Sequence, residues 1–401
     1  MKPAAAALAI GSGGEPQGRS AHSAAEPSVR LAPAAQRIDA LREEWQALAG
    51  QASEPNPFCE PWFVAASVRH LPHSDVQLAE VRKGTGLIGL VPLSVEPRYG
   101  RVPVNNVQNW RHHHHFLGTP LVRAGHEQAF WRALIHALDG ERWVPGFLHL
   151  RDLNEDGPLH RALLAAAAEL GRPAVTVYRE TRAFLHSSLG AAAYYEQTVR
   201  KKKRKELARL RNRLSELGPI TTRTLLASDD LSAWCDDFLN LERAGWKGRE
   251  GTALACSAGT ESFFRQCVAG ARAAGRLQFL RLDLADRPLA MLVNFLTPPG
   301  SFSFKTAFDE EFARFSPGVL LQIDNLAILE RPGIAWMDSC AAEQHPMIES
   351  LWGERRAIVR VTVPLSGVRR RIAYTAARAL VEASAARRRL TAWAQAREVA
   401  P

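Results

Sequence analysis

Cysteine and tyrosine are scarce in this chain, which has five of each among 401 residues. The cysteines form no C-x-x-C pair and show no metal-ligand spacing, which excludes a disulfide-stapled fold and a cysteine zinc site. No apolar run approaches the ~20 residues that a membrane-spanning helix requires. The apolar run at the start is short and alanine-rich, so residues 1–33 are predicted to be a disordered lead rather than a signal peptide. These absences predict a reduced, cytoplasmic protein without a transmembrane segment.

Net positive charge is absent outside two short segments, although the net charge of the chain is +10. Residues 200–213 hold nine Lys/Arg and one acid, and residues 369–389 hold seven Arg and one acid. The rest of the chain is therefore slightly acidic. A duplex-binding fold spreads its positive charge over one face of a domain, so this distribution argues against duplex recognition as the main function.

The length and composition are those of an ordinary two-domain globular protein, with 46% hydrophobic and 23% charged residues. Hydrophobic periodicity and turn residues predict a first half over 34–180 and a second half over 181–365, followed by a basic helix or tail over 366–401. Each half reads as three strands, a helix, a strand, a helix and a strand. The repeated order predicts two copies of one mixed α/β unit.

A long basic helix is predicted over 190–217, at the start of the second half. Its leucines recur every three or four residues and form a narrow stripe that packs against the protein (Leu207, Leu210, Leu214 and Leu217). Lys and Arg occupy the other faces, without interleaved aromatic residues for base stacking. A solvated helix with one packed stripe is one interpretation; a surface for RNA, a polyphosphorylated cofactor or an acidic membrane is the other.

The run SFSFKTAFDEEFARFSPGVLLQIDNL (301–326) carries the most information about chemistry. Strand alternation places Phe302 and Phe304 on one face and Lys305 on the other. A Ser-Pro-Gly turn over 316–318 then starts a helix, with Ser as N-cap and Pro in the first turn. The free amides of a helix start, next to a glycine, make an anion site. A plain cap is the commoner reason for this pattern.

Four separated stretches resemble a known family: LERAGWKGREGTAL (241–254), FFRQCVAGARAAGRLQFLRLDL (263–284), FKTAFDEEFARFSPGVLL (304–321) and MDSCAAEQHPMIESLWGERR (337–356). They are similar to the GNAT-type N-acetyltransferase family associated with cellulose biosynthesis (CelD/BcsL-like), which is related to the FemAB peptidyltransferases. The resemblance covers roughly residues 35–365. It implies a tandem GNAT (acyl-CoA N-acyltransferase) fold, in agreement with the repeated strand order.

The resemblance also implies acyl-CoA, most simply acetyl-CoA, as the co-substrate, with no metal. The diphosphate of the coenzyme is expected at Arg314, Ser316, Gly318 and Val319, and Phe304 of the preceding strand is expected beside it. The loop has one glycine where GNAT loops usually have two.

Direct transfer to an amine needs a group that accepts the ammonium proton and amides that stabilise the oxyanion. GNAT enzymes often protonate the leaving sulfur with a tyrosine, but no tyrosine occurs between residues 196 and 373. Asp338 and Lys305 lie on strands that are predicted to be parallel neighbours, and a splayed pair there would form an acyl slot. They are either catalytic or a structural salt bridge. Glu242 is a further candidate base, or a surface charge on its helix. His345 is also a candidate base, or an ordinary loop histidine.

Substrate binding is predicted at Trp246 and Lys247, either as an acceptor-binding lid or as a loop with an aromatic plug. In the run NWRHHHHFLGTP, a strand would place His113 and His115 on one face, where they would line a groove between the halves. Two imidazoles two residues apart can also start a metal site, but the sequence offers no partner ligands nearby.

Three functions are compatible with these residues. The first is transfer of an acyl group from acyl-CoA to an amine of a small molecule, sugar or polysaccharide precursor. The second is FemAB-like transfer from aminoacyl-tRNA, with Arg200–Arg213 binding the RNA. The third is a non-catalytic GNAT scaffold in polysaccharide biosynthesis.

Overall fold

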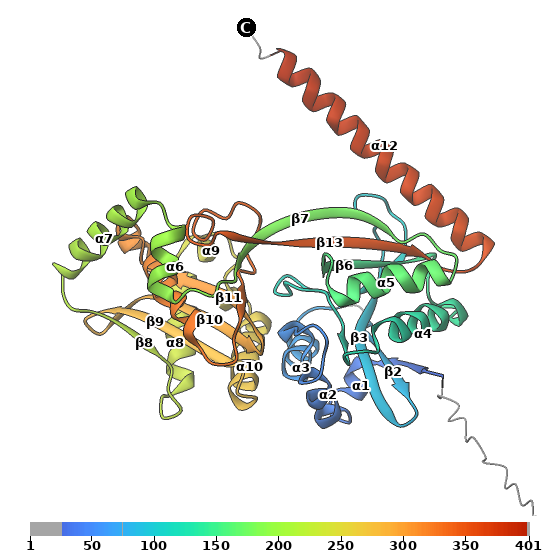
Figure 1. The fold of residues 1–401 in the computed structure, drawn as a ribbon, viewed down its shortest axis with the longest axis horizontal. Helices are drawn as coiled ribbons and strands as arrows, with labels where there is room; N and C mark the ends of the chain where they lie inside the picture. The colour runs from blue at the N-terminus through green and yellow to red at the C-terminus, as the bar shows by residue number, and fades with distance from the viewer. Residues whose placement is uncertain (1–25, 74, 399–401) are drawn as a thin grey trace, which may run out of the picture.

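The computed structural model describes residues 26–73 and 75–398, with side chains as far as Ala383. One mixed sheet of 13 strands runs through both halves in the order β1-β2-β3-β4-β6-β13-β7-β12-β11-β10-β9-β8, with the short β5 beside β3. Figure 1 shows two lobes side by side, joined across the top by the long strands β7 and β13.

The first lobe contains strands β1 to β6 and helices α1 to α5. Its strands are β1 (Ser28–Pro33), β2 (Gln77–Lys83), β3 (Gly86–Glu96), β4 (Asn106–Asn109), β5 (Leu121–Val122) and β6 (Phe147–Asn154). Its helices are α1 (Ala34–Arg37), α2 (Arg42–Ala49), α3 (Pro61–His70), α4 (Glu127–Gly140) and α5 (Pro158–Glu169). The α4 stripe Phe130, Trp131, Leu134, Ile135 and Leu138 is buried against the sheet, as its helical spacing predicts.

The second lobe repeats the arrangement. Its strands are β8 (Ile220–Thr224), β9 (Leu277–Leu284), β10 (Arg287–Thr297), β11 (Gly300–Phe308) and β12 (Trp336–Asp338). Its helices are α6 (Ala191–Thr198), α7 (Lys201–Ser215), α8 (Leu231–Ala244), α9 (Trp246–Arg249), α10 (Ala258–Ala273) and α11 (Pro317–Asp324). In each lobe four antiparallel strands are followed by a parallel pair, β4 with β6 and β11 with β12. This is the tandem GNAT fold.

The lobes exchange strands, which the sequence did not indicate. β7 (Val175–Leu185) is one continuous strand, where two separate strands were predicted over 173–188. It pairs with β13 (Glu354–Pro364) along most of its length, and its end pairs with β12 of the second lobe. β13 was predicted to close the second half, but it lies between β6 and β7 in the first lobe. A boundary at residue 180 therefore cuts through a strand that both lobes share.

Three other expectations are corrected. Residues 28–33 form β1 at the edge of the sheet, because pairing with β2 satisfies the backbone groups on one side of the strand. Residues 1–25 lie outside the described part of the chain. The basic helix is broken into α6 and α7 at Val199 and Arg200, and Leu217 is exposed, while Leu207, Leu210 and Leu214 are buried as predicted. The segment MIESLW (347–352), whose pattern predicts a short helix, forms turns as far as Leu351.

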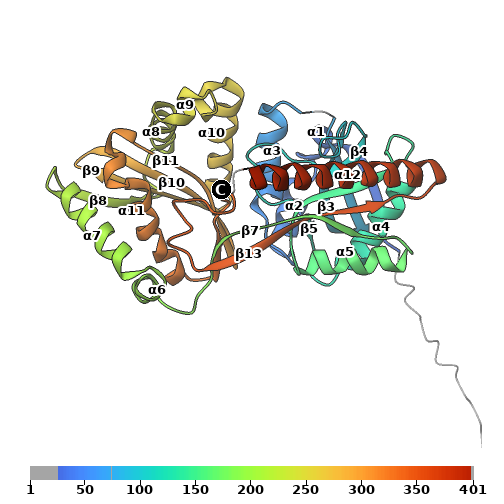
Figure 2. The ribbon, with the colours of Figure 1, turned by 90° about the horizontal axis from the view of Figure 1, so that it is seen from above.

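Phenylalanines from both lobes pack together in one apolar core. Phe58 of the first lobe lies 5.6 Å, between ring centroids, from Phe302 of β11, and Phe63 lies 5.5 Å from Phe263 of α10. α3 and α10 also pack on each other at this junction (Figure 2). The shared core fixes the lobes relative to each other, because separating them would expose these rings to water.

Candidate functional site

The parallel strands β11 and β12 separate soon after they meet. They are paired only from Gly300 to Phe302 on β11 and from Trp336 to Asp338 on β12. β11 then continues to Phe308 without β12 beside it, so its backbone on that side is free of a strand partner. Such a parting leaves amides that can bind an acyl carbonyl.

A β-bulge in β11 determines which side chains face this opening. The pairing with β10 shifts by one residue between Val293 and Asn294, so that Phe304 is the extra residue. Gln322 of α11 contacts both Ser303 and Thr306, which places those two on the α11 side. Lys305 therefore lies on the same face as Phe304. The strand alternation predicted from sequence was wrong here, because a bulge interrupts the period of two.

Lys305 lies partly buried between α8, α9 and the first lobe. The pKa of its ammonium is lowered to about 8, mainly by burial; the charge of Glu242 partly offsets this effect and that of Lys247 adds to it. Within the described part of the chain, no carboxylate forms an ion pair with Lys305. It is therefore a cation that can give up its proton near neutral pH.

Glu242 and Lys247 form a short ion pair next to Lys305. The Lys247 ammonium donates to the Glu242 carboxylate across 2.8 Å, and the other carboxylate oxygen accepts from the Leu254 amide, also at 2.8 Å. Glu242 is buried, and both of its carboxylate oxygens are occupied by these two hydrogen bonds. The structure thus brings together the predicted residues Glu242, Lys247 and Lys305, but places Glu242 as the partner of Lys247. Trp246 begins α9 and its ring is 48% exposed.

The histidine run forms a turn rather than a strand, so the predicted alternation of its side chains was wrong. His113 is exposed, and His115 is buried with its Nε2 2.7 Å from the Leu117 carbonyl. The rings nearer the site are those of His112 and His114. His114 stacks on Phe263, with ring centroids 5.3 Å apart.

Both of these rings are neutral at physiological pH. Burial, followed by the charge of Arg111, lowers the pKa of His112 to about 3. Burial, followed by the charge of Lys305, lowers that of His114 to about 2. They are thus hydrogen-bonding groups rather than bases. Among the residues the structure describes, no three His, Cys, Asp or Glu side chains are grouped as metal ligands.

His345 lies in the loop after β12, where the charge of Lys247 acts on it. It is half-buried, and its Nδ1 has no hydrogen-bond partner. Burial lowers its pKa below the ordinary value, and the charge of Lys247 adds to this. His345 remains neutral and available as a hydrogen-bond acceptor beside the ion pair.

Asp338, predicted as a catalytic candidate, has its carboxylate engaged by three donors. It is fully buried and accepts from Arg182 of β7 at 2.8 Å, from Arg356 of β13 at 2.9 Å and from the Cys340 amide at 2.9 Å. Lys305 is not its partner, so the predicted pairing of the two was wrong. The strand exchange, which the sequence did not reveal, supplies both arginines. No sequence signal marked either of them.

The turn before α11 has part of the geometry of an anion site. Ser316 is the N-cap, but its backbone is left-handed (φ 54°) and its side chain makes no capping bond. The Val319 amide donates to the Ser316 carbonyl at 2.9 Å. Gly318 is buried, and a Cβ added there would lie 3.0 Å from the Met347 methyl. Exposed Arg314 has no ion-pair partner among the described residues and lies over its neighbour Phe315.

The corresponding opening in the first lobe is filled by its own chain. β4 and β6 pair only at two positions, and Asn109 then bridges the gap, donating to the Arg151 carbonyl at 2.9 Å and accepting from the Arg151 amide at 2.8 Å. A side chain on Gly118 would collide with the Arg151 carbonyl. An acyl slot like that of the second lobe is therefore closed here.

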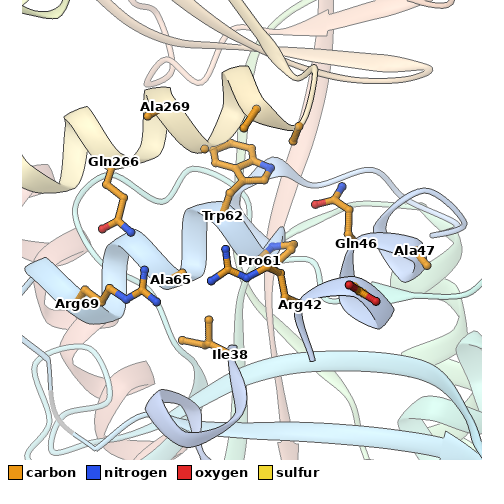
Figure 3. Close-up of a pocket in the computed structure, with 14 residues that line it drawn as sticks. Ile38, Arg42, Gln46, Ala47, Pro61, Trp62, Ala65, Arg69, Gln266 and Ala269 are labelled. Carbon is orange, nitrogen blue, oxygen red and sulfur yellow. The ribbon is translucent and has the colours of Figure 1, made fainter. Parts of the chain in front are cut away.

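A hollow of 680 Å³ lies between α2 and α3 of the first lobe and α10 of the second (Figure 3). Trp62 lies at its centre and Ala269 on its wall, with Arg42 and Arg69 at its rim. Both arginines pair with the same carboxylate, that of Asp39. None of the groups around Lys305 lines this hollow, so it is not the place where β11 and β12 part.

Residues 201–345 match the family model of the acetyltransferase (GNAT) domain. The matched segment lies in the second lobe and supports an acyltransferase. A comparison with curated proteins finds no match. The match does not distinguish the cellulose-biosynthesis type from other GNAT families.

Several solved structures have the same fold, and the similarity extends over nearly the whole length of each of them. FemX shares 11% identity with a TM-score of 0.56, over 80% of this chain and 95% of its own. The C-terminal domain of a putative lysylphosphatidylglycerol synthetase from Agrobacterium fabrum shares 11% identity with a TM-score of 0.53, over 84% and 96%. A protein of unknown function from Bacteroides thetaiotaomicron VPI-5482 shares 13% identity with a TM-score of 0.52, over 82% and 97%. These similarities show the fold of the whole chain.

Proposed function

We propose that this protein is an N-acyltransferase that moves an acyl group from acyl-CoA to an amine by direct transfer. The observation that carries the proposal is the parting of β11 and β12 beyond Phe302, directly beside Lys305. The free edge of β11 lies where a carbonyl can accept from backbone amides. Among the described residues, no helix has the length and apolar character to cross a membrane.

Lys305 is the proposed proton acceptor. The incoming amine arrives as an ammonium, which cannot attack a carbonyl until it loses a proton. Neutral Lys305 takes that proton; the amine nitrogen then bonds to the carbonyl carbon, the carbon–sulfur bond breaks, and the second proton that the nitrogen loses passes through water to the leaving thiolate. Burial is what keeps the pKa of Lys305 low; the charge of Glu242 opposes it, and that of Lys247, which Glu242 holds in place, adds to it. His114 and exposed Trp246 form the walls that an acceptor would contact.

The coenzyme diphosphate is proposed to bind at Arg314 and the Gly318 amide, with Met347 displaced. Met347 is a flexible side chain from a loop and can move without disturbing the sheet. Acetyl-CoA is the simplest donor, and an amino sugar or polysaccharide precursor is the proposed acceptor class. The link to cellulose biosynthesis rests on the sequence resemblance alone.

A thermal-shift series with CoA thioesters tests this assignment. A thioester at 100 times its dissociation constant should stabilise the wild type by ~2.7 kcal/mol. Gly318→Glu should abolish the gain, since its carboxylate would repel the diphosphate, whereas the matched control Gly318→Ala should retain most of it. The melting temperature of each variant without ligand shows whether it folds. If no thioester stabilises the wild type, the CoA assignment is wrong.

A second candidate donor is aminoacyl-tRNA. Met347 covers Gly318 and the Val319 amide donates to Ser316, so the turn has few free donors for a diphosphate. By contrast, α7 carries several exposed cations that have no ion-pair partner among the described residues (Lys201, Lys202, Lys205, Arg209 and Arg213). The related fold of FemX is consistent with this donor. Transfer from aminoacyl-tRNA, without any response to CoA thioesters, would favour this candidate over the first.

A further inference from the structure

A second pocket, of 370 Å³, opens on the first lobe at the strands β4, β6, β7 and β13. The helix α12 (Val368–Glu398) starts after β13 and borders this pocket through Val381. α12 is held against the lobe by Tyr374, whose ring lies 5.6 Å from that of Phe147. The volume is within the range of small-molecule sites, roughly 300–1,000 Å³.

Three guanidinium groups and one carboxylate line this pocket, so it is positively charged. The cations are Arg98, Arg151 and Arg360, and the acid is Glu96. Glu96 accepts from Ser94 at 2.8 Å rather than from an arginine. Arg360 donates to Asp152, which also pairs with Arg111, so one acid serves two cations. The pocket thus has more positive charge than the protein neutralises.

Arg151 is the least compensated of these cations. Its guanidinium makes no hydrogen bond or ion pair within the described part of the chain, although the side chain is partly buried. Burial and the charge of Arg360 lower its pKa from the ordinary value. The charge of Glu96 offsets part of this effect, and the guanidinium nitrogens of Arg151 are not buried away from solvent, so an anion in the pocket can reach them. Arg151 is therefore poised to bind an anion.

Irregular backbone places these side chains together. Asp152 has a positive φ of 57°, and the pairing of β6 with β13 shifts between Val359 and Val361, opposite Arg151 and Asp152. The pairing of β7 with β13 shifts at the same place. Bulges that coincide in adjacent strands re-aim side chains and are common beside binding sites. Here they coincide where Arg151 and Arg360 meet.

Neutral groups complete the lining. His149 has its Nδ1 3.1 Å from the Thr362 hydroxyl, and burial lowers its pKa to about 3, so it adds hydrogen-bonding capacity without charge. Tyr178 is 43% exposed, and Arg360 lies over its ring at 4.4 Å. The ring forms an apolar wall on which a sugar can pack.

We propose that this pocket binds the phosphate group of a small phosphorylated molecule of sugar size. Two or three guanidinium forks match the charge and the geometry of a phosphate dianion. Further arginines lead from the pocket towards the second lobe: the charges of Arg151, Arg360 and Arg182 all act on Arg111, and Arg182 binds Asp338 beside the β11 opening. The inference that the bound molecule is also the amine acceptor rests on the proposed function. The inference that the pocket binds a phosphate group does not depend on it.

Isothermal titration calorimetry with inorganic phosphate, glucosamine 6-phosphate, glucosamine and succinate tests the pocket. The wild type should bind both phosphates saturably and should bind glucosamine and succinate at least tenfold more weakly. Arg151→Gln should weaken phosphate binding at least tenfold. Arg142→Gln, which removes an exposed cation outside the pocket, should leave it unchanged. Arg98→Gln provides a second test at an exposed position if Arg151→Gln does not fold.

Three outcomes would overturn the inference: no saturable phosphate binding, equal binding of succinate, or equal affinities in the Arg151 and Arg142 variants. The calorimetry needs no turnover, so phosphate binding without any acyl transfer would leave this site standing while the proposed function fails. If transfer does occur, Arg151→Gln should raise KM for glucosamine 6-phosphate while kcat stays within about twofold. An unchanged KM would show that the pocket is not an acceptor site.

Discussion

Arg182 of β7 donates to the Asp338 carboxylate of β12 across 2.8 Å, and both side chains are buried. Arg356 of β13 binds the same carboxylate, so one acid joins the two exchanged strands to the second lobe. Burial acts to raise the pKa of Asp338, but the charges of the two arginines outweigh it and hold the pKa below its ordinary value. The carboxylate is thus ionised at any physiological pH.

Asp338→Ala should lower the free energy of unfolding by about 3–5 kcal/mol, because it leaves two buried guanidinium groups without a counter-charge. Urea denaturation measures the loss. Asp39→Ala, which breaks an exposed pair with Arg42 and Arg69, should cost far less than Asp338→Ala. Since the pKa of Asp338 is depressed, its contribution is complete at neutral pH and is lost only below about pH 4. Equal losses in the two variants would contradict the role given to Asp338.

The rate of acyl transfer should rise with pH and level off above about pH 8, where Lys305 becomes neutral. Initial rates of CoA release between pH 6 and pH 9.5 give the profile. Lys305→Met should lower kcat by about 10²–10⁴-fold and remove the inflection. Lys203→Met, on the exposed face of α7, is the matched control and should keep both. An inflection that persists in Lys305→Met would assign the base elsewhere.

Lys305→Met should also stabilise the protein at neutral pH, by roughly 1–3 kcal/mol before allowance for its partial exposure. The pKa of Lys305 is lower in the folded protein than in the unfolded chain, so protonation favours unfolding. The stability of the wild type should therefore increase as the pH rises from about 8 towards 10.5, the ordinary value. Urea midpoints at pH 7 and pH 10 should differ less in the variant than in the wild type.

Binding of tRNA, if it occurs, should depend steeply on salt and on the start of α7. Replacing Lys201, Lys202 and Lys205 by Gln should reduce the slope of log affinity against log salt by up to about three phosphate contacts. Filter binding between 50 and 200 mM salt measures this. A variant that neutralises Arg369 and Arg371 of α12 removes exposed positive charge elsewhere and should leave the slope unchanged. Equal slopes in all three proteins would remove α7 from the binding surface.

Much of the second lobe could be predicted from local pattern. The strand and helix order, the buried leucine stripe of α7 and the N-cap at Ser316 follow from periodicity and from turn residues that act within a few positions. The resemblance located the GNAT domain in the segment that the family model matches. Lys305, Glu242 and Lys247 were singled out individually, and the structure brings them together.

Errors occurred where non-local pairing decides the outcome. Lys305 was assigned to the wrong face because a bulge depends on how β11 meets β10. The predicted pairing of Asp338 with Lys305 was wrong because the two arginines that bind Asp338 come from strands on either side of it in sequence. The histidines nearest the site are His112 and His114 rather than His113 and His115, because contacts with Phe63 and Phe263 turn that segment out of a strand.

By itself the sequence determined the two α/β units and the residue types available for acyl transfer, since helix and strand periods are properties of neighbouring residues. The tertiary structure alone decided that β7 and β13 are shared between the lobes, that Asp338 is neutralised by Arg182 and Arg356, and that Arg151 faces a pocket without a counter-charge. Those outcomes depend on which buried charges and rings meet across the sheet, and residues on separate strands, such as Arg182 and Asp338, meet only when the chain is folded.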